Sequence, residues 1–205
     1  MIKIVITGSI ASGKTTASKI ISNKRGPLFS ADTVVKKLYK NKKFKTIIKK
    51  KFNFKSNLNF KEKIKHKILD NKKSLVRLEK IIHPLVRKEM NLFIKKNEYK
   101  KFLFFEIPLL IENKLSKNFD AVIFIKTQLN LRLSRYLSSG GNSKLFSLFN
   151  SHQLKDAVKT KFCNHVVVNN KSLFILKKNL SNIMKLYEWN FFRYRNNWTF
   201  FSRRS

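Results

Sequence analysis

Cysteine is almost absent from this sequence, since Cys163 is the single one among 205 residues. An internal disulfide is therefore excluded, which is typical of a protein in a reducing compartment. No apolar run reaches the ~18 residues that a membrane-spanning helix needs. The opening segment MIKIVIT is too short for the apolar region of a signal peptide and leads straight into a glycine loop. We therefore expect a cytoplasmic protein without a membrane span.

Acidic residues are scarce as well. The chain has 11 Asp and Glu residues against 46 Lys and Arg residues, which gives a formal net charge of +35. Such a charge is typical of proteins that bind nucleic acids or anionic membranes. However, nucleic-acid sites favour arginine for bidentate contacts, whereas 37 of these basic residues are lysines spread over most of the chain. We attribute the charge to the codon composition of an AT-rich genome and expect no specific nucleic-acid partner.

The distribution of apolar residues predicts an α/β fold. Hydrophobic residues make up 42% of the chain, enough to bury the core of one domain with insertions. Strands are predicted within 2–7, 26–32, 100–110, 120–126 and 165–170. Helices are predicted within 14–21, 33–95, 129–137 and 172–188, with a break at 138–143. This alternation predicts a doubly wound parallel sheet with helices on both faces, into which the helical stretch 33–95 is inserted.

Glycine is rare, with five residues in the chain, yet Gly8 and Gly13 fit a phosphate-binding motif. With Lys14 and Thr15 they match G-x-x-x-x-G-K-[ST] between a predicted strand and a predicted helix. In this motif backbone N–H groups surround phosphate oxygens, the lysine reaches the β- and γ-phosphates, and the hydroxyl faces Mg²⁺. An ordinary strand–turn–helix is the alternative. We predict a nucleoside triphosphate site formed by Gly8, Ala11, Ser12, Gly13, Lys14, Thr15 and Thr16.

Two carboxylates indicate what receives the phosphoryl group. Asp32 is expected at the end of the second strand and Glu106 at the end of the third. Ligands of a doubly wound sheet lie beyond the carboxyl ends of its strands, so both residues should face the bound phosphate. A small-molecule kinase needs this arrangement to orient the attacking hydroxyl and to hold Mg²⁺. Two alternatives stay open: Asp32 as the N-cap of a helix that begins near Thr33, and Glu106 as a surface residue.

Five segments then occur in the order and spacing of a known family. They are TGSIASGKTT, SADTVVKKLY, LEKIIHPLVRKEM, EIPLLIENKLSKNFDAVIFI and QLKDAVKTKFCNHVVVNN. Over residues 1–188 the chain resembles the dephospho-coenzyme A kinases. This resemblance implies a P-loop fold like that of the nucleoside monophosphate kinases. It also implies an enzyme that uses ATP and Mg²⁺ to phosphorylate the 3′-hydroxyl group of dephospho-CoA.

The resemblance also implies roles for residues and segments. Catalytic roles fall to Asp32, Lys14 and Arg135, and Thr15 would face the metal. Acceptor contacts fall to Asp32, His83, Glu106, Pro108 and Leu109, although a histidine like His83, taken alone, is more often a core residue. The glycine loop, Lys159 and Asn169 would contact ATP. The nucleotide-binding core would comprise 1–32, 100–127 and 161–188, with a CoA-binding domain at 33–99 and a lid at 128–160.

The chain departs from the family pattern at two positions. Ser30 stands where the family usually has an aspartate, and Ser139 stands where the lid usually has a second arginine. A lid arginine stabilises charge on the transferring group, and Arg132 or Lys144 are the candidates to replace it. A kinase that binds CoA but turns over poorly is therefore one alternative. Another P-loop kinase for nucleosides or nucleotides, and a basic P-loop ATPase that binds nucleic acid, are the others.

The tail 189–205 lies outside the resemblance. It interleaves aromatic residues with arginines. Three interpretations stay open: an extension packed on the last helix, a helix on a membrane surface, and stacking on single-stranded nucleic acid.

Overall fold

The computed structural model describes residues 1–54 and 59–201, except for the side chains of Lys72 and of residues 190–201. A sheet of five parallel strands forms its centre, in the spatial order β2-β3-β1-β4-β5. The predicted α/β fold with a parallel sheet is thus confirmed. The strands are β1 (Ile2–Gly8), β2 (Leu28–Ser30), β3 (Phe102–Glu106), β4 (Ala121–Lys126) and β5 (His165–Val168).

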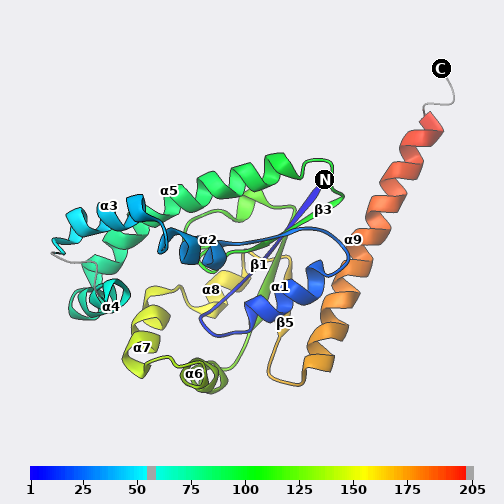
Figure 1. The fold of residues 1–205 in the computed structure, drawn as a ribbon. Coiled ribbons are helices and arrows are strands. Elements are labelled where there is room, and N and C mark those ends of the chain that lie inside the picture. The colour runs from blue at the N-terminus through cyan, green and yellow to red at the C-terminus, as the bar shows by residue number, and fades with distance from the viewer. Residues whose placement is uncertain (55–58, 202–205) are drawn as a thin grey trace.

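Helices cover both faces of the sheet (Figure 1). On one face, α1 (Lys14–Ser22) and α9 (Leu173–Phe201) pack through Ile21, Leu180 and Met184. On the other face, α2 (Ala31–Leu38) and α5 (Lys72–Lys96) pack through Ala31 and Met90. Because β1, β3 and β4 are buried on both faces, their sequences are continuous apolar runs rather than alternating ones.

The inserted helical stretch has a hydrophobic core of its own. It comprises α2, α3 (Lys42–Phe52), α4 (Phe60–Asp70) and α5, as predicted, while residues 55–58 lie outside the described part. Its buried cluster includes Phe44, Ile48, Ile64, Leu78 and Ile82. Leu148 and Phe149 of α7 (Ser143–His152) pack against the same cluster. This cluster therefore joins the insertion to a later part of the chain.

Residues 128–160 fold into α6 (Leu129–Ser138), α7 and α8 (Asp156–Thr160). The predicted break at 138–143 separates α6 from α7. Helices α7 and α8 and a short 3-10 helix, η1 (Ser116–Asn118), were not predicted from the sequence. Asn142 caps α7 by accepting hydrogen bonds from the backbone of Lys144 and Leu145, and such capping favours helix initiation.

Two predictions about the second strand are corrected. The strand β2 ends at Ser30, and Asp32 lies in the first turn of α2 instead of at the strand end. The N-cap of α2 is Ser30, whose hydroxyl accepts a hydrogen bond from the backbone N–H of Thr33 at 3.4 Å. Asp32 is therefore not the N-cap. Serine caps helices as well as aspartate does, so the sequence alone did not distinguish the two positions.

The end of the chain also differs from the prediction. Strand β5 ends at Val168, two residues early, and α9 continues from Leu173 past residue 188 as far as Phe201. Its second half extends beyond the sheet (Figure 1). The aromatic and arginine side chains that prompted the three interpretations of the tail lie outside the described residues, apart from Trp189. No helix in the described part of the chain combines the length and the apolar character needed to cross a bilayer.

Candidate active site

The glycine loop joins β1 to α1 and has a conformation that few other residues adopt. Gly13 has φ of 91°, and a Cβ atom there would lie 2.4 Å from Nδ2 of Asn169. Gly8 has φ of 154°, and a Cβ atom there would lie 2.6 Å from the carbonyl oxygen of Ile125. Both glycines are thus required by the backbone and by close neighbours. The loop ends at the start of α1, where backbone N–H groups are free to bind an anion.

Lys14 lies in this loop with 8% of its surface exposed. Its Nζ donates a hydrogen bond to the carbonyl oxygen of Ser9 at 2.9 Å. Burial lowers the pKa of Lys14 to about 8, against the opposing effect of the carboxylates of Asp32 and Glu106. A lysine that is buried beside carboxylates but hydrogen-bonded to a neutral carbonyl is ready to bind an anion.

Two carboxylates lie at the carboxyl edge of the sheet. Glu106 is 1% exposed and accepts a hydrogen bond from Oγ1 of Thr15 at 2.5 Å, so it is not a surface residue. Asp32 is open to solvent within the cleft, yet the surrounding protein raises the pKa of its carboxyl group. Burial is the main cause, Glu106 adds to it, and Lys14 opposes it. A raised pKa makes this carboxylate a stronger proton acceptor than an ordinary aspartate.

A cleft of about 790 Å³ runs from the glycine loop into the helical insertion. At the loop end it is lined by polar and charged groups of Lys14, Thr15 and Asp32. Its other end is mainly apolar and is formed by side chains of α2, α4, α5 and α7, namely Val35, Ile64, Ile68, Leu75, Leu78, Ile82 and Phe149. The cleft can therefore hold a ligand with a phosphate group at one end and apolar groups at the other.

Near the rim of the cleft, a histidine connects two helices. Nε2 of His152, the last residue of α7, lies 2.9 Å from Oε2 of Glu79 on α5. His83 also lines the cleft, one turn after Glu79. Burial lowers the pKa of His83, while the charge of Glu79 raises it. The neutral form of His83 is favoured, which suits a hydrogen-bonding contact to a ligand.

Arg135 of α6 lies beside the loop. Its Nη2 donates a hydrogen bond to the carbonyl oxygen of Asn169 at 3.1 Å. Its Nη1 is buried and has no hydrogen-bond partner among the described residues, and it would lie 3.9 Å from a Cβ atom at Gly13. A buried donor without a partner is costly, and a phosphate oxygen at the loop would satisfy it. Asn169 itself donates from Nδ2 to the carbonyl oxygen of Ser12 at 2.9 Å.

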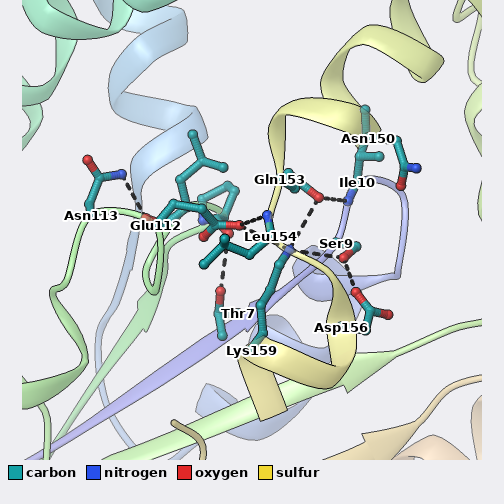
Figure 2. Close-up of polar contacts among 12 residues, drawn as sticks. Thr7, Ser9, Ile10, Glu112, Asn113, Asn150, Gln153, Leu154, Asp156 and Lys159 are labelled. Carbon is teal, nitrogen blue, oxygen red and sulfur yellow. Dashed lines mark hydrogen bonds and ion pairs between the residues drawn. The ribbon is translucent and has the colours of Figure 1, made fainter. Parts of the chain in front are cut away.

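Lys159 does not line the cleft. It lies on the other side of the loop, and Figure 2 shows its side chain directed toward Ser9, Gln153 and Glu112. It is fully buried, and its Nζ lies 3.1 Å from Oε1 of Glu112 and 3.1 Å from Oγ of Ser9. The Ser9 hydroxyl donates to Oδ1 of Asp156 at 2.5 Å, and the backbone N–H of Ile10 donates to Oε1 of Gln153 at 3.1 Å. These contacts tie the glycine loop to Gln153, which follows α7, and to Asp156 and Lys159 of α8.

The predicted site residues thus fall into two groups. One group lines the cleft: Ala11, Gly13, Lys14, Thr15, Asp32, His83, Pro108, Leu109 and Arg135. The other does not, and consists of Gly8, Ser12, Thr16, Glu106, Lys159 and Asn169. Within the second group, Glu106 bonds to Thr15, and Asn169 and Lys159 bond to the loop.

Sequence reasoning missed the residues behind the loop. Glu112, Gln153 and Asp156 were not predicted as site residues, although all three belong to segments that carry the family resemblance. Ser9 was included only as an unspecified position of the motif. Their signal is weak because the contacts of Glu112 and Gln153 link positions that are far apart in the chain.

Comparison with known proteins agrees with this geometry. The family model described as Dephospho-CoA kinase matches residues 2–174. The dephospho-CoA kinase of Bartonella henselae is 31% identical over 192 residues, which cover 87% of this chain and 98% of that protein. The dephospho-CoA kinase of Rickettsia conorii is 31% identical over 186 residues, which cover 90% and 97%.

Solved structures show the same fold. Dephospho-CoA kinase from Campylobacter jejuni is 25% identical, with a TM-score of 0.61 over 89% of this chain and 95% of that chain. Shikimate kinase from Acinetobacter baumannii, at 14% identity, shares the fold alone, with a TM-score of 0.55 over 93% of this chain and 94% of its own. The chain therefore belongs to the dephospho-CoA kinase family, and with it to the P-loop kinases of coenzyme A biosynthesis.

Proposed function

We propose that this protein transfers the γ-phosphoryl group of ATP to the 3′-hydroxyl group of dephospho-CoA. The observation that carries the proposal is the cleft that Lys14 and Asp32 share. Lys14 belongs to a loop built for phosphate, and Asp32 is a carboxylate with a raised pKa in the same cleft. A phosphate donor and a hydroxyl acceptor placed between them would have the in-line arrangement that phosphoryl transfer needs.

Asp32 is the residue that orients the acceptor and accepts its proton. The attacking hydroxyl donates a hydrogen bond to the carboxylate and loses its proton to it as the new P–O bond forms. Lys14 and Arg135 would place positive charge beside the phosphoryl oxygens and so stabilise their negative charge in the transition state. Because Nη1 of Arg135 has no partner among the described residues, it can donate to a phosphate oxygen without breaking another hydrogen bond.

The residues present at the loop fit a magnesium ion. The Thr15 hydroxyl and the Glu106 carboxylate are both oxygen donors and lie 2.5 Å apart, and Mg²⁺ prefers oxygen ligands from one or two protein groups together with substrate phosphates. Thr15 would hold the ion directly, with Glu106 as its neighbour. When bound, the ion neutralises charge on the phosphates of ATP.

The acceptor would occupy the rest of the cleft. His83, Pro108 and Leu109 line it and would contact dephospho-CoA, whereas Glu106 would act through Thr15. On this proposal the insertion 33–99 binds the acceptor, 128–160 is the lid, and 1–32, 100–127 and 161–188 form the nucleotide-binding core. Closure of the lid would exclude water, which otherwise competes as the phosphoryl acceptor.

The test is formation of coenzyme A from dephospho-CoA, ATP and Mg²⁺, followed by mass spectrometry. We expect the Asp32→Asn variant to lose activity, because the amide cannot accept the proton. The control is Asp70→Asn, which makes the same change at an exposed position at the end of α4 and should leave activity unchanged.

Parallel reactions replace dephospho-CoA with a panel of nucleosides or with RNA. Phosphorylation of a nucleoside would indicate a different acceptor, and ATP hydrolysis that requires RNA would indicate a nucleic-acid-dependent ATPase. Either result without coenzyme A would refute the proposal.

A further inference from the structure

Two consecutive residues at the end of α7 bond to two different parts of the cleft wall. Nε2 of His152 lies 2.9 Å from Oε2 of Glu79, on α5 of the insertion. Oε1 of Gln153, the next residue, accepts a hydrogen bond from the backbone N–H of Ile10 in the glycine loop at 3.1 Å, a contact that Figure 2 shows. All four residues line the cleft. The end of α7 therefore joins the insertion to the phosphate loop.

The contact between His152 and Glu79, which we call the bridge, connects the proposed lid 128–160 to the insertion. Helix α7 packs against α4 and α6, and its Leu148 and Phe149 contact the apolar cluster of the insertion. Within the described residues, the bridge is the hydrogen bond or ion pair that joins these two segments. It therefore adds a polar contact, with a defined geometry, to an apolar interface.

The bridge leaves room for a ligand and can open. With the two side chains in contact, the cleft still has a volume of about 790 Å³, and ligand pockets typically measure about 300–1,000 Å³. The side chains of His152 and Glu79 are 33% and 20% exposed, so solvent reaches both and opening leaves no charge deeply buried. These properties suit a contact that opens for ligand entry and then closes over the occupied cleft.

We propose that His152 is a positioning residue that holds the insertion, with the acceptor bound to it, against the glycine loop, and that its protonated form does so most strongly. The inference rests on the proposed function, because it adds a residue to that reaction which does not touch the reacting atoms. Phosphoryl transfer needs the acceptor hydroxyl in line with the γ-phosphate, and a misplacement of about 1 Å can lower the rate by roughly 10²-fold. Since Gln153 is bonded to the loop, the bond of His152 to Glu79 fixes the insertion relative to the phosphate.

The charge of His152 sets the strength of the bridge. A protonated imidazole beside a carboxylate forms a charge-assisted hydrogen bond, which is roughly twice as strong as a neutral one. Histidine is the side chain whose charge ordinarily changes between about pH 5 and pH 8. We therefore expect the bridge to be strong at pH 6 and weaker at pH 8.

Other charged groups surround the bridge on the helices that pack around it. Those that line the cleft are His83 and Arg87 on α5, Lys61 and Lys65 on α4, and Arg135 on α6. Two more do not line it: Arg132 of α6, which donates to Oδ1 of Asn150 at 2.8 Å, and Lys144 of α7. All of them are retained when His152 is replaced. A comparison of variant and wild type at one pH therefore isolates the charge of His152.

The test measures kcat and KM for dephospho-CoA in the coenzyme A assay at pH 6 and pH 8. At pH 6 we expect His152→Ala to lower kcat/KM roughly fivefold, the upper end of what a partly exposed ion pair contributes. At pH 8 the loss should be only about twofold, because a neutral hydrogen bond is lost instead. The matched control is His66→Ala, which removes an exposed histidine of α4 outside the cleft and should match the wild type at both pH values.

Further variants test the partner and the charge. Glu79→Gln should show the same loss as His152→Ala, and the double variant should be no worse than either single variant, because the two residues act through one contact. His152→Arg keeps a cation at both pH values. Its advantage over His152→Ala should therefore be the same at pH 6 and pH 8, unlike that of the wild type.

Two results would overturn the inference. A loss in His152→Ala that is equal at pH 6 and pH 8 would mean that His152 acts by packing and not by its charge. Losses that multiply in the double variant would mean that His152 and Glu79 act separately. If the wild-type protein forms no coenzyme A, the proposed function fails instead. Hydrogen exchange over α7 at pH 6 then tests the bridge without a substrate, since faster exchange in His152→Ala than in His66→Ala supports it and equal exchange refutes it.

Discussion

The glycine loop has a buried lysine on each of its two sides, and the two lysines are bonded differently. We call the side that faces the cleft, with Lys14, the front, and the opposite side, with Lys159, the back. At the front, Lys14 has one hydrogen bond within the described structure, from Nζ to a backbone carbonyl. At the back, Nζ of Lys159 contacts Ser9, Glu112 and Gln153, at 3.1, 3.1 and 3.5 Å. The first lysine has donors to spare for a ligand, whereas the second is bonded within the protein.

This difference assigns the two lysines to different roles, with Lys14 binding a ligand and Lys159 stabilising the fold around the loop. A buried ammonium without a carboxylate partner costs stability and is kept for its function, while one paired with a carboxylate holds two segments together. Changes at the back of the loop should therefore act mainly on folding, and changes at the front mainly on catalysis.

The largest effect is expected at the back. Replacing Lys159 by Met leaves the carboxylate of Glu112, whose side chain is 13% exposed, without its cation. Loss of one partner of a buried pair costs about 3–5 kcal/mol. We expect the free energy of unfolding, measured with urea, to fall by this amount. Lys161→Met, which changes an exposed lysine nearby, is the control and should have little effect.

Removing both charges sharpens this result. The double variant Lys159→Met with Glu112→Leu should be more stable than Lys159→Met alone, because no unpaired charge stays buried. Equal stability of the single and double variants would contradict the assignment of the pair as the main contact behind the loop.

The next effect is expected at the front. Lys14→Met should lower kcat/KM by about 10²–10³-fold, because a charged donor to the phosphates is lost. The free energy of unfolding should stay the same or rise, since burial disfavours the charged form that the variant removes. The kinetic assay and the urea titration are performed on the same preparation. A large loss of stability would instead show that Lys14 supports the loop as Lys159 does.

The contrast between front and back also explains what the sequence could predict. The sheet and the front of the loop were predictable because their signals are local: apolar strand segments and a motif contained in eight consecutive residues. The back was not, because Glu112 and Lys159 meet only in the folded chain. The family resemblance does distinguish Lys159 among the 37 lysines, but as a contact to ATP and not as the partner of Glu112.

Two errors have a similar cause. The predicted strand within 26–32 places Asp32 at its end, whereas β2 ends at Ser30. Ser30 and Asp32 are both good capping residues, and the hydrogen bond from Thr33 selects Ser30. Helix α7 was missed because its stability depends on tertiary packing, in which Leu145 and Phe146 are buried and Leu148 and Phe149 contact the insertion. Local propensity alone is a weak predictor for such a helix.

A smaller effect concerns pH. Lys14 has a pKa of about 8 in the free protein, so its charge is present at pH 7 and is lost as the pH rises. One pH unit above that pKa leaves about a tenth of the lysine protonated. Affinity for ATP with Mg²⁺, measured by calorimetry, should therefore fall roughly tenfold between pH 7 and pH 9. In Lys14→Arg the guanidinium stays charged over this range, so the decline should disappear. A decline of the same size in both proteins would mean that another group titrates.

The smallest effect concerns the stability of Asp32→Asn. The pKa of Asp32 is raised above its ordinary value of 3.8, mainly by burial. The folded protein therefore favours the protonated carboxyl group, and at neutral pH the ionised group opposes folding. Asparagine removes that charge, so we expect Asp32→Asn to melt at a slightly higher temperature than the wild type at pH 7, although it is inactive.

The pH dependence of the higher melting temperature shows whether it results from removal of the Asp32 charge. Below pH 3.8 the carboxyl group is protonated in the folded and the unfolded protein, so the gain should vanish there. The Asp70→Asn control changes an exposed carboxylate and should show no gain at either pH. If Asp32→Asn were less stable than the wild type at pH 7, Asp32 would be a supporting residue like those at the back of the loop. A gain at neutral pH alone would mean that Asp32 is kept at a cost to folding, as expected of a residue that acts on a ligand.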